Sequence, residues 1–257
     1  MRDSELIAKV GGGIADIPAQ AWDALTDGSN PFVSHAFLSA IEDSESVGGR
    51  SGWTARPILM ETADGTLAGA LPAYIKEHSQ GEYVFDHAWA EAWHRAGGRY
   101  YPKLQIAVPF TPATGPRILT RDAQVSLPLL RAAEAMCVQN GLSSAHATFI
   151  APDQVGVFEA AGWLLREDTQ FHWTNRDYAS FDGFLDALSS RKRKDLRKER
   201  AKAQEGLEIH ALRGSEIEER HWDAFWMFYQ DTGQRKWGQP YLTRRAFSLL
   251  SERMADH

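Results

Sequence analysis

Acid–base chemistry is favoured in the segment from Tyr83 to Leu119, because titratable groups, aromatic rings and chain-bending Pro and Gly occur together there. Asp86 and His87, which lie among aromatic residues, are candidates for a general base or for groups that orient a nucleophile. A structural alternative stays open: Asp86 would cap the following helix, and His87 would be a half-buried core residue.

Two basic residues, Lys103 and Arg117, flank an irregular loop within this segment. A strand-like run over residues 103–108 leads into three prolines and a glycine, which cannot continue a central strand or a helix. Lys103 and Arg117 are candidates for binding a phosphate or carboxylate, Arg117 through two parallel hydrogen bonds. The alternative is a loop that ion pairs hold in place.

Aromatic and histidine side chains are further candidates for binding. The aromatic residues would line a groove for an acceptor, although such residues more often belong to a core. They are Tyr83, Trp89, Tyr100 and Tyr101. Glu91 and His94 have no third ligand at a suitable spacing, so we expect no metal site.

Residues 191–202 contain eight basic and two acidic residues, whereas the rest of the chain is acidic. Their spacing predicts a helix on which Arg193 and Arg197 share one stripe. This stripe would be a solvated face or a clamp for an anion such as a tRNA acceptor stem, a CoA phosphate or a cell-wall precursor.

Several elements must position these residues. Ser34 and Asp122 are expected to cap helices, the second running to a stop at Asn140-Gly141 and offering free N–H groups as an anion site. Asp64-Gly65 predicts a hairpin between strands 53–61 and 66–76. Residues 81–87, 144–150 and 207–212 read as strands, residues 88–96 as a short helix, and residues 181–204 as one long helix.

The composition is that of an ordinary globular protein, with 43% hydrophobic and 24% charged residues in 257. No apolar run is long enough for a membrane span or has the form of a signal peptide, so a cytoplasmic location is expected. The single Cys137 excludes an internal disulfide.

The order of the first-half elements resembles the GNAT acyl-CoA N-acyltransferase fold, most clearly in the segment LLRAAEAMCVQNGLSSAHATFIAPDQVGVFEAAGWLLRED. This resemblance implies a mixed α/β (α+β) fold whose largely antiparallel sheet is flanked by helices. It also implies that His146 and His172 lie on strands near a cleft, although a lone strand histidine is more often a packed core residue. The usual pyrophosphate loop is replaced by TPATGPR, where Thr111 and Thr114 become candidates for cofactor binding.

The strings GEYVFDHAWA, YYPKLQIAVPFTPATGPRIL and RKWGQPYLTRRAF, with residues 170–203, resemble the FemAB-like group of predicted N-acyltransferases, which are described as peptidoglycan biosynthesis or recognition proteins. The resemblance implies a first GNAT-like domain over residues 1–176 and the beginning of a second over residues 177–257. Because the family continues beyond the point that corresponds to His257, we expect the second domain to be truncated here.

This resemblance implies an N-acyltransferase that transfers an acyl or aminoacyl group to an amine, on a peptidoglycan-type precursor. The donor would be an acyl-CoA or an aminoacyl-tRNA, and Asp86, His87 and His172 would be the catalytic candidates. Two alternatives stay open: a catalytically silent module that recognises a cell-wall glycopeptide, and a tRNA-binding protein.

Overall fold

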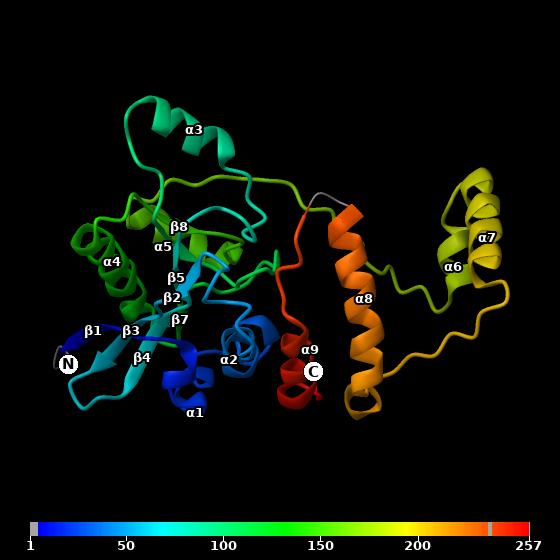
Figure 1. The fold of residues 1–257 in the computed structure, drawn as a ribbon, viewed down its shortest axis with the longest axis horizontal. Coiled ribbons are helices and arrows are strands. Elements are labelled where there is room, and N and C mark those ends of the chain that lie inside the picture. The colour runs from blue at the N-terminus through cyan, green and yellow to red at the C-terminus, as the bar shows by residue number, and fades with distance from the viewer. Residues whose placement is uncertain (1–4, 236–237, 257) are drawn as a thin grey trace. The chain divides into compact units, whose positions relative to one another are not determined.

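The computed structural model describes residues 5–235 and 238–256, which form a mixed α/β fold with mostly antiparallel strands, as expected (Figure 1). The strands of the described residues make two four-stranded sheets. The first sheet has the order β1-β3-β4-β7, all antiparallel. Its strands are β1 (Leu6–Val10), β3 (Ile58–Thr62), β4 (Leu67–Leu71) and β7 (Leu119–Thr120).

The second sheet has the order β2-β5-β6-β8, and only β6 and β8 run parallel. Its strands are β2 (Trp53–Ala55), β5 (Ala73–Lys76), β6 (Lys103–Ile106) and β8 (Ala145–Ala147). Beyond Ile106 the chain leaves β8 and forms the irregular segment 107–117, in which Gly115 makes an isolated parallel bridge to Ile150, three residues after the end of β8. The loop predicted from the prolines is therefore confirmed.

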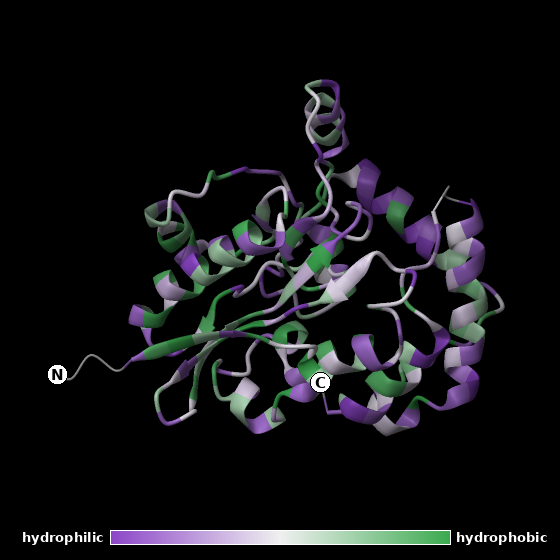
Figure 2. Cartoon of the chain, turned by 60° about the vertical axis from the view of Figure 1, so that its left-hand side comes forward, coloured by the Kyte–Doolittle hydropathy of each residue, from purple (hydrophilic) through white to green (hydrophobic). Residues whose placement is uncertain are grey.

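Helices cover both faces of these sheets. On one face α4 (Ala123–Asn140) and α5 (Val155–Ala160) pack in a core with Leu104 and Ile106. On the other face lies a core with residues of α1 (Ala19–Asp23) and α2 (His35–Asp43), and α9 (Arg244–Arg253) packs on α2. Figure 2 shows the strands at the centre of this arrangement, with many hydrophobic residues.

Local signals in the sequence determine where several of these elements begin and end. The Asp122 carboxylate accepts a hydrogen bond of 2.9 Å from the N–H of Gln124, and Gly141 ends α4 in the left-handed conformation. Ser34 caps α2 in the same way. The caps and the Asp64-Gly65 hairpin are confirmed. Each of the strands expected over residues 53–61 and 66–76 is, however, divided into two shorter strands that belong to different sheets. The anion site expected at the start of α4 is already occupied in part by the carboxylate of Asp122.

Helix α3 (His87–Arg95) is also confirmed, but none of its residues is buried, and it projects from the sheets in Figures 1 and 2. The strand expected over residues 81–87 is wrong, because this segment is an irregular loop in which Gly81 and Tyr83 have positive φ. An added Cβ at Gly81 would lie 2.7 Å from the ring of Phe110. This close approach requires glycine and fixes the loop beside Phe110.

The contacts divide the chain into two compact units, residues 1–165 with 214–257, and residues 166–213. In the first unit, α8 (Glu219–Arg235) packs on α9, and the N-cap Thr243 donates to the carbonyl of Ser44. Residues 214–257 therefore pack with the first unit here. The assignment of 1–176 and 177–257 to two GNAT-like domains stays a prediction.

The smaller unit contains α6 (Phe181–Asp186) and α7 (Ser190–Gln204). The single helix expected over 181–204 is therefore two helices. Residues 207–212 form no strand, because a strand needs a paired neighbour and the described part of the chain provides none.

Within the described residues, no helix combines the length and apolar character that crossing a membrane requires.

A buried carboxylate on α2 predicts a pH dependence of stability. Glu42 accepts a 2.8 Å hydrogen bond from the N–H of Ile14, while its Oε1 has no hydrogen-bond partner among the described residues, and burial raises the pKa of Glu42 to about 7. Since the folded state holds the proton more tightly, this contribution to stability is complete below the unfolded pKa and is lost as the pH rises through 7. Through Glu42, the free energy of unfolding of the wild type is expected to fall by on the order of 1–3 kcal/mol between pH 5 and 8.5. The variant Glu42→Gln should not show this fall.

Urea unfolding of the wild type and of Glu42→Gln at both pH values measures this difference. An equal change of unfolding free energy with pH in the two proteins would contradict the assignment to Glu42.

Candidate functional site

One face of the second sheet is polar although it is buried. The pairs Lys76 with Lys103 and Tyr74 with Gln105 lie opposite each other on β5 and β6, and His146 on β8 is the partner of Gln105. Directly opposite residues share a face, so all five side chains project on the side away from α4. A buried sheet normally carries apolar residues on both faces, and this polar face is therefore a candidate for function.

Lys103 is the centre of this face. Its Nζ donates to Ser79 Oγ at 2.8 Å, to Glu82 Oε2 at 2.8 Å and to Asp86 Oδ2 at 2.7 Å. The side chains of Lys103, Glu82 and Asp86 are only 1%, 1% and 5% exposed. These contacts join β6 to the loop before α3, and we refer to Lys76, Ser79, Glu82, Asp86 and Lys103 as the lysine–carboxylate cluster.

Lys76 is the second cation of the cluster. Its Nζ donates to the carbonyl of Gln80 at 3.1 Å, lies 4.0 Å from Glu82 Oε1 and sits 3.8 Å from the centre of the Trp53 ring. Burial lowers the pKa of Lys76 to about 7, with Glu82 opposing this shift. A fraction of Lys76 is therefore neutral near neutral pH.

The two carboxylates of the cluster have opposite electrostatic settings. Burial raises the pKa of Glu82 above its ordinary value, although Lys103 opposes the shift. Burial also acts on Asp86, but hydrogen bonds from Lys103 and from the Tyr100 hydroxyl outweigh it and lower the pKa of Asp86. Asp86 is thus held ionised, while Glu82 is the better proton acceptor.

Several polar atoms of this face make no hydrogen bond with any described residue. They are Glu82 Oε1, Asp86 Oδ1, Gln105 Oε1 and Tyr74 Oη, all buried. Three of the four are pure acceptors, and an unsatisfied buried acceptor is costly. A ligand with several N–H donors, such as an ammonium group, complements them.

The irregular segment 107–117 lies beside the cluster, because the N–H of Phe110 donates to the carbonyl of Gly81, the neighbour of Glu82. Arg117 holds the segment in place by donating to the carbonyls of Thr148 at 2.8 Å and Ala113 at 2.7 Å. Arg117 therefore holds the loop through hydrogen bonds to backbone carbonyls instead of the ion pairs that were expected. Burial lowers the pKa of Arg117 to about 10.

The backbone of this segment also presents unused donors. Among the described residues, the N–H groups of Thr111, Ala113 and Thr114 have no hydrogen-bond acceptor. The Thr111 hydroxyl donates to the carbonyl of Pro109 at 3.0 Å. Free backbone donors of this kind can hold a carbonyl oxygen on which negative charge develops.

The structure brings together several of the residues predicted from the sequence. Asp86 is at the N-cap position of α3, but its side chain makes no capping hydrogen bond and binds Lys103 and Tyr100 instead. Tyr101 Oη lies 2.8 Å from Ser79 Oγ. His146 lies 6.0 Å from the Tyr100 ring, and burial lowers the pKa of His146 to about 4, so it is neutral.

Other predicted residues lie apart from the cluster. His87 and Trp89 are exposed on α3, and Tyr83 packs edge-on against Tyr241. His172 is exposed in an extended segment of the smaller unit, without the strand that was expected.

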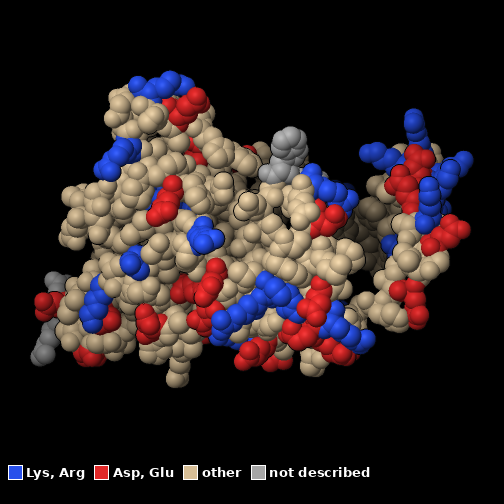
Figure 3. All heavy atoms as spheres, in the orientation of Figure 1, with Lys and Arg blue, Asp and Glu red and all other residues tan. Residues whose placement is uncertain are grey.

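On α7, Arg193 donates to the carbonyls of Leu185 and Leu188, and Arg197 pairs with Asp182 at 3.2 Å. Both arginines thus have partners within their own unit. Figure 3 shows basic side chains (blue) mixed with acidic side chains (red) in the region of this helix. Anion binding by α7 stays a prediction.

Sequence reasoning missed Lys76, Ser79, Glu82 and Gln105. The sequence does contain a signal for them. Lysine is the last residue of the strand-like run AYIK and the first residue of the run KLQI, where a buried sheet would carry apolar residues. Two such lysines on paired strands need carboxylate partners.

Within the described residues, no group of three or more His, Cys, Asp or Glu side chains is arranged to hold a metal ion.

Residues 13–257 match the model of a protein family described as peptidoglycan biosynthesis/recognition. No curated protein and no solved structure gives a significant match to the chain.

Proposed function

The chain belongs to the FemAB-like family of peptidoglycan biosynthesis and recognition proteins, and from this membership and the lysine–carboxylate cluster we propose that it transfers an acyl or aminoacyl group to an amine. The acceptor is a peptidoglycan-type precursor with a free amino group. The observation that carries the proposal is a pair of buried carboxylate oxygens, Glu82 Oε1 and Asp86 Oδ1, which accept no hydrogen bond from any described residue. Glu82 Oε1 has only the long contact of 4.0 Å with Lys76 Nζ.

The cluster has the groups that amine binding requires. The ammonium group of the acceptor donates to Asp86 Oδ1, which stays ionised because Lys103 and Tyr100 donate to its other oxygen. A second N–H donates to Glu82 Oε1. An amine attacks a carbonyl only after losing its extra proton, and Glu82, whose pKa is raised by burial, accepts that proton.

Transfer then exchanges one bond at the donor's carbonyl carbon. The amine nitrogen forms a C–N bond and gives up a second proton, the C–S bond of an acyl-CoA or the C–O bond of an aminoacyl ester breaks, and the leaving thiolate or alkoxide takes up that proton. The unused N–H groups of Thr111, Ala113 and Thr114 stabilise the negative charge on the carbonyl oxygen. No metal ion is assigned a role.

The loop over residues 77–86 must move for the acceptor to reach the cluster, because the cluster is covered in this structure. Tyr83 in this loop has φ of 56°, a conformation that costs free energy for a non-glycine residue. Such a loop is suited to opening and closing over a substrate.

A transfer assay tests the proposal. The protein is incubated with a muramyl peptide that has a free side-chain amine, together with acetyl-CoA, a longer acyl-CoA or an aminoacyl-tRNA, and the acceptor's mass is measured. A mass increase by the acyl or aminoacyl group is expected with one donor class. Stoichiometric binding of the peptide without product from any donor would instead support a recognition module.

A further inference from the structure

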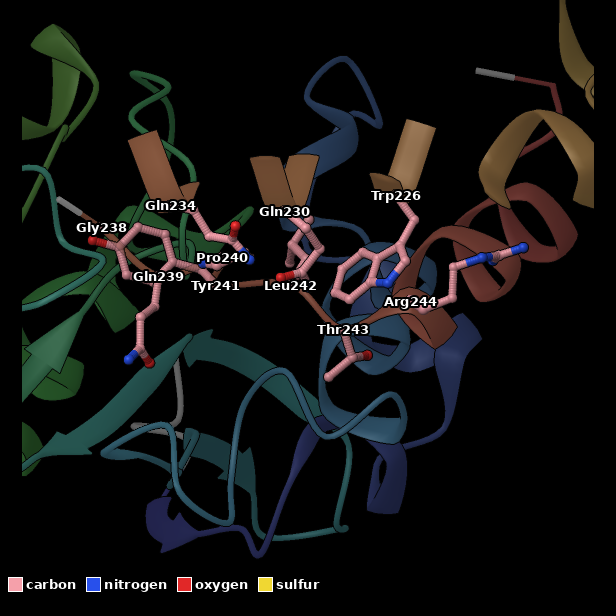
Figure 4. A pocket seen from close by; sticks show the side chains of 10 residues that line it. All are labelled: Trp226, Gln230, Gln234, Gly238, Gln239, Pro240, Tyr241, Leu242, Thr243 and Arg244. Carbon is pink, nitrogen blue, oxygen red and sulfur yellow. The ribbon is translucent and has the colours of Figure 1, made fainter. Parts of the chain in front are cut away.

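A groove separate from the lysine–carboxylate cluster lies between α8 and the segment 238–244 of the first unit, with a volume of about 510 Å³. Trp226, Gln230 and Gln234 follow each other at intervals of four residues and therefore share one face of α8. Figure 4 shows these three side chains extending from the helix toward the opposite segment.

The opposite wall of the groove is held in place by the protein's own contacts. The Tyr229 hydroxyl accepts hydrogen bonds from the N–H groups of Tyr241 at 3.0 Å and Leu242 at 3.2 Å. Arg244 pairs with Glu219 and Asp223. The wall is thus formed before any ligand binds, and the charge of its arginine is neutralised.

The polar groups left for a ligand are uncharged. The side-chain amides of Gln230, Gln234 and Gln239 form no hydrogen bond with any residue in the described part of the chain. Each amide can donate two hydrogen bonds and accept others. Trp226 and Tyr241 add aromatic rings, which bind apolar faces.

We propose that this groove binds an N-acetylated amino sugar, the glycan part of the acceptor. A pyranose ring has an apolar face for Trp226 or Tyr241 and a rim of hydroxyl and acetamido groups for the three amides. Arg244 is the one cation among the described lining residues, and its pairing with Glu219 and Asp223 disfavours a phosphate as the main ligand.

The groove is connected to the cluster by a chain of aromatic contacts. Tyr241 stacks on Phe110 with ring centres 5.2 Å apart, and Phe110 packs against Trp53 at 5.3 Å. Lys76 Nζ of the cluster lies 3.8 Å from the centre of the Trp53 ring, the last ring of this chain. A glycopeptide with its sugar in the groove therefore extends toward the carboxylates, a placement that rests on the proposed function.

Binding of tetra-N-acetylchitotetraose, measured by calorimetry without any acyl donor, tests the groove. The wild type is expected to bind it in preference to cellotetraose, which lacks the acetamido groups. The double variant Gln230→Ala, Gln234→Ala is expected to weaken binding at least tenfold. Its control is Gln139→Ala, an exposed glutamine on α4, which should leave the dissociation constant unchanged.

No binding to the wild type at millimolar sugar, or equal binding by the double variant, would overturn the site. Equal affinity for cellotetraose would overturn the assignment to an amino sugar. The two proposals fail separately: acyl transfer without sugar binding contradicts only the groove, and sugar binding without transfer contradicts only the proposed reaction.

Discussion

Replacing Lys103 with Met is expected to lower the free energy of unfolding by about 3–5 kcal/mol, because it leaves two buried carboxylates without their shared cation. Lys103 donates to both Glu82 and Asp86, and all three side chains are almost completely buried. Met replaces the lysine stem and lacks only the terminal ammonium, so the loss measures mainly the missing charge and its hydrogen bonds rather than a cavity. Urea unfolding at pH 7 provides the value.

Lys9→Met is the matched control. Lys9 pairs with Glu61 at 2.5 Å, but its side chain is 54% exposed, and such surface pairs contribute only about 0–1 kcal/mol. If Lys103→Met and Lys9→Met lowered the free energy of unfolding by similar amounts, burial of the cluster would not explain the effect of Lys103→Met. Adding Glu82→Gln and Asp86→Asn to Lys103→Met should recover part of the lost stability, since the uncompensated charges are then removed.

Asp86→Asn is expected to reduce the ratio of turnover to Michaelis constant for acyl transfer by about 10²- to 10³-fold, because removing one partner of a buried, hydrogen-bonded charge pair costs about 2–5 kcal/mol. Asn keeps the volume of Asp86 and can still accept from Tyr100, but it has no charge to hold an ammonium group. The loss should appear both in turnover and in the Michaelis constant for the amine acceptor. Initial rates over a range of acceptor concentrations separate the two.

Asp43→Asn serves as the control for this change. Asp43 also forms an ion pair, 2.7 Å from Arg253, but it lies on α2 and its side chain is 34% exposed. Its replacement should leave turnover unchanged. If Asp86→Asn is folded and turns over at the wild-type rate, Asp86 has only a structural role.

The parts of the fold that the sequence predicts correctly depend on local signals. Asp122 and Gly141 delimit α4, and Ser34 begins α2, because a cap acts within one turn of its own helix. The pairing of Asp64 with Gly65 similarly predicts the hairpin from adjacent residues alone. A strand, in contrast, needs a partner that is distant in the chain, and the strand predicted at residues 207–212 is wrong.

The candidate site was predicted only in part for the same reason. Asp86, Tyr100 and Lys103 were predicted as site residues from their residue types. Their contacts in the cluster could not be predicted, because Lys103 binds Asp86 and Glu82, which lie 17 and 21 positions earlier in the chain. Lys76 meets Lys103 through the register of β5 against β6, which no local pattern specifies. Glu82 reaches Lys103 from the irregular loop that follows β5. The groove likewise combines α8 with a segment that Tyr229 positions.

Calorimetric binding of two matched acceptors tests most directly whether Glu82 Oε1 and Asp86 Oδ1 hold an amine. The acceptors are a muramyl peptide with a free side-chain amine and the same peptide acetylated at that nitrogen. We expect the free amine to bind at least tenfold more tightly to the wild type, and the preference to disappear in Asp86→Asn. Equal affinities of the wild type for both peptides would contradict amine binding by Glu82 and Asp86.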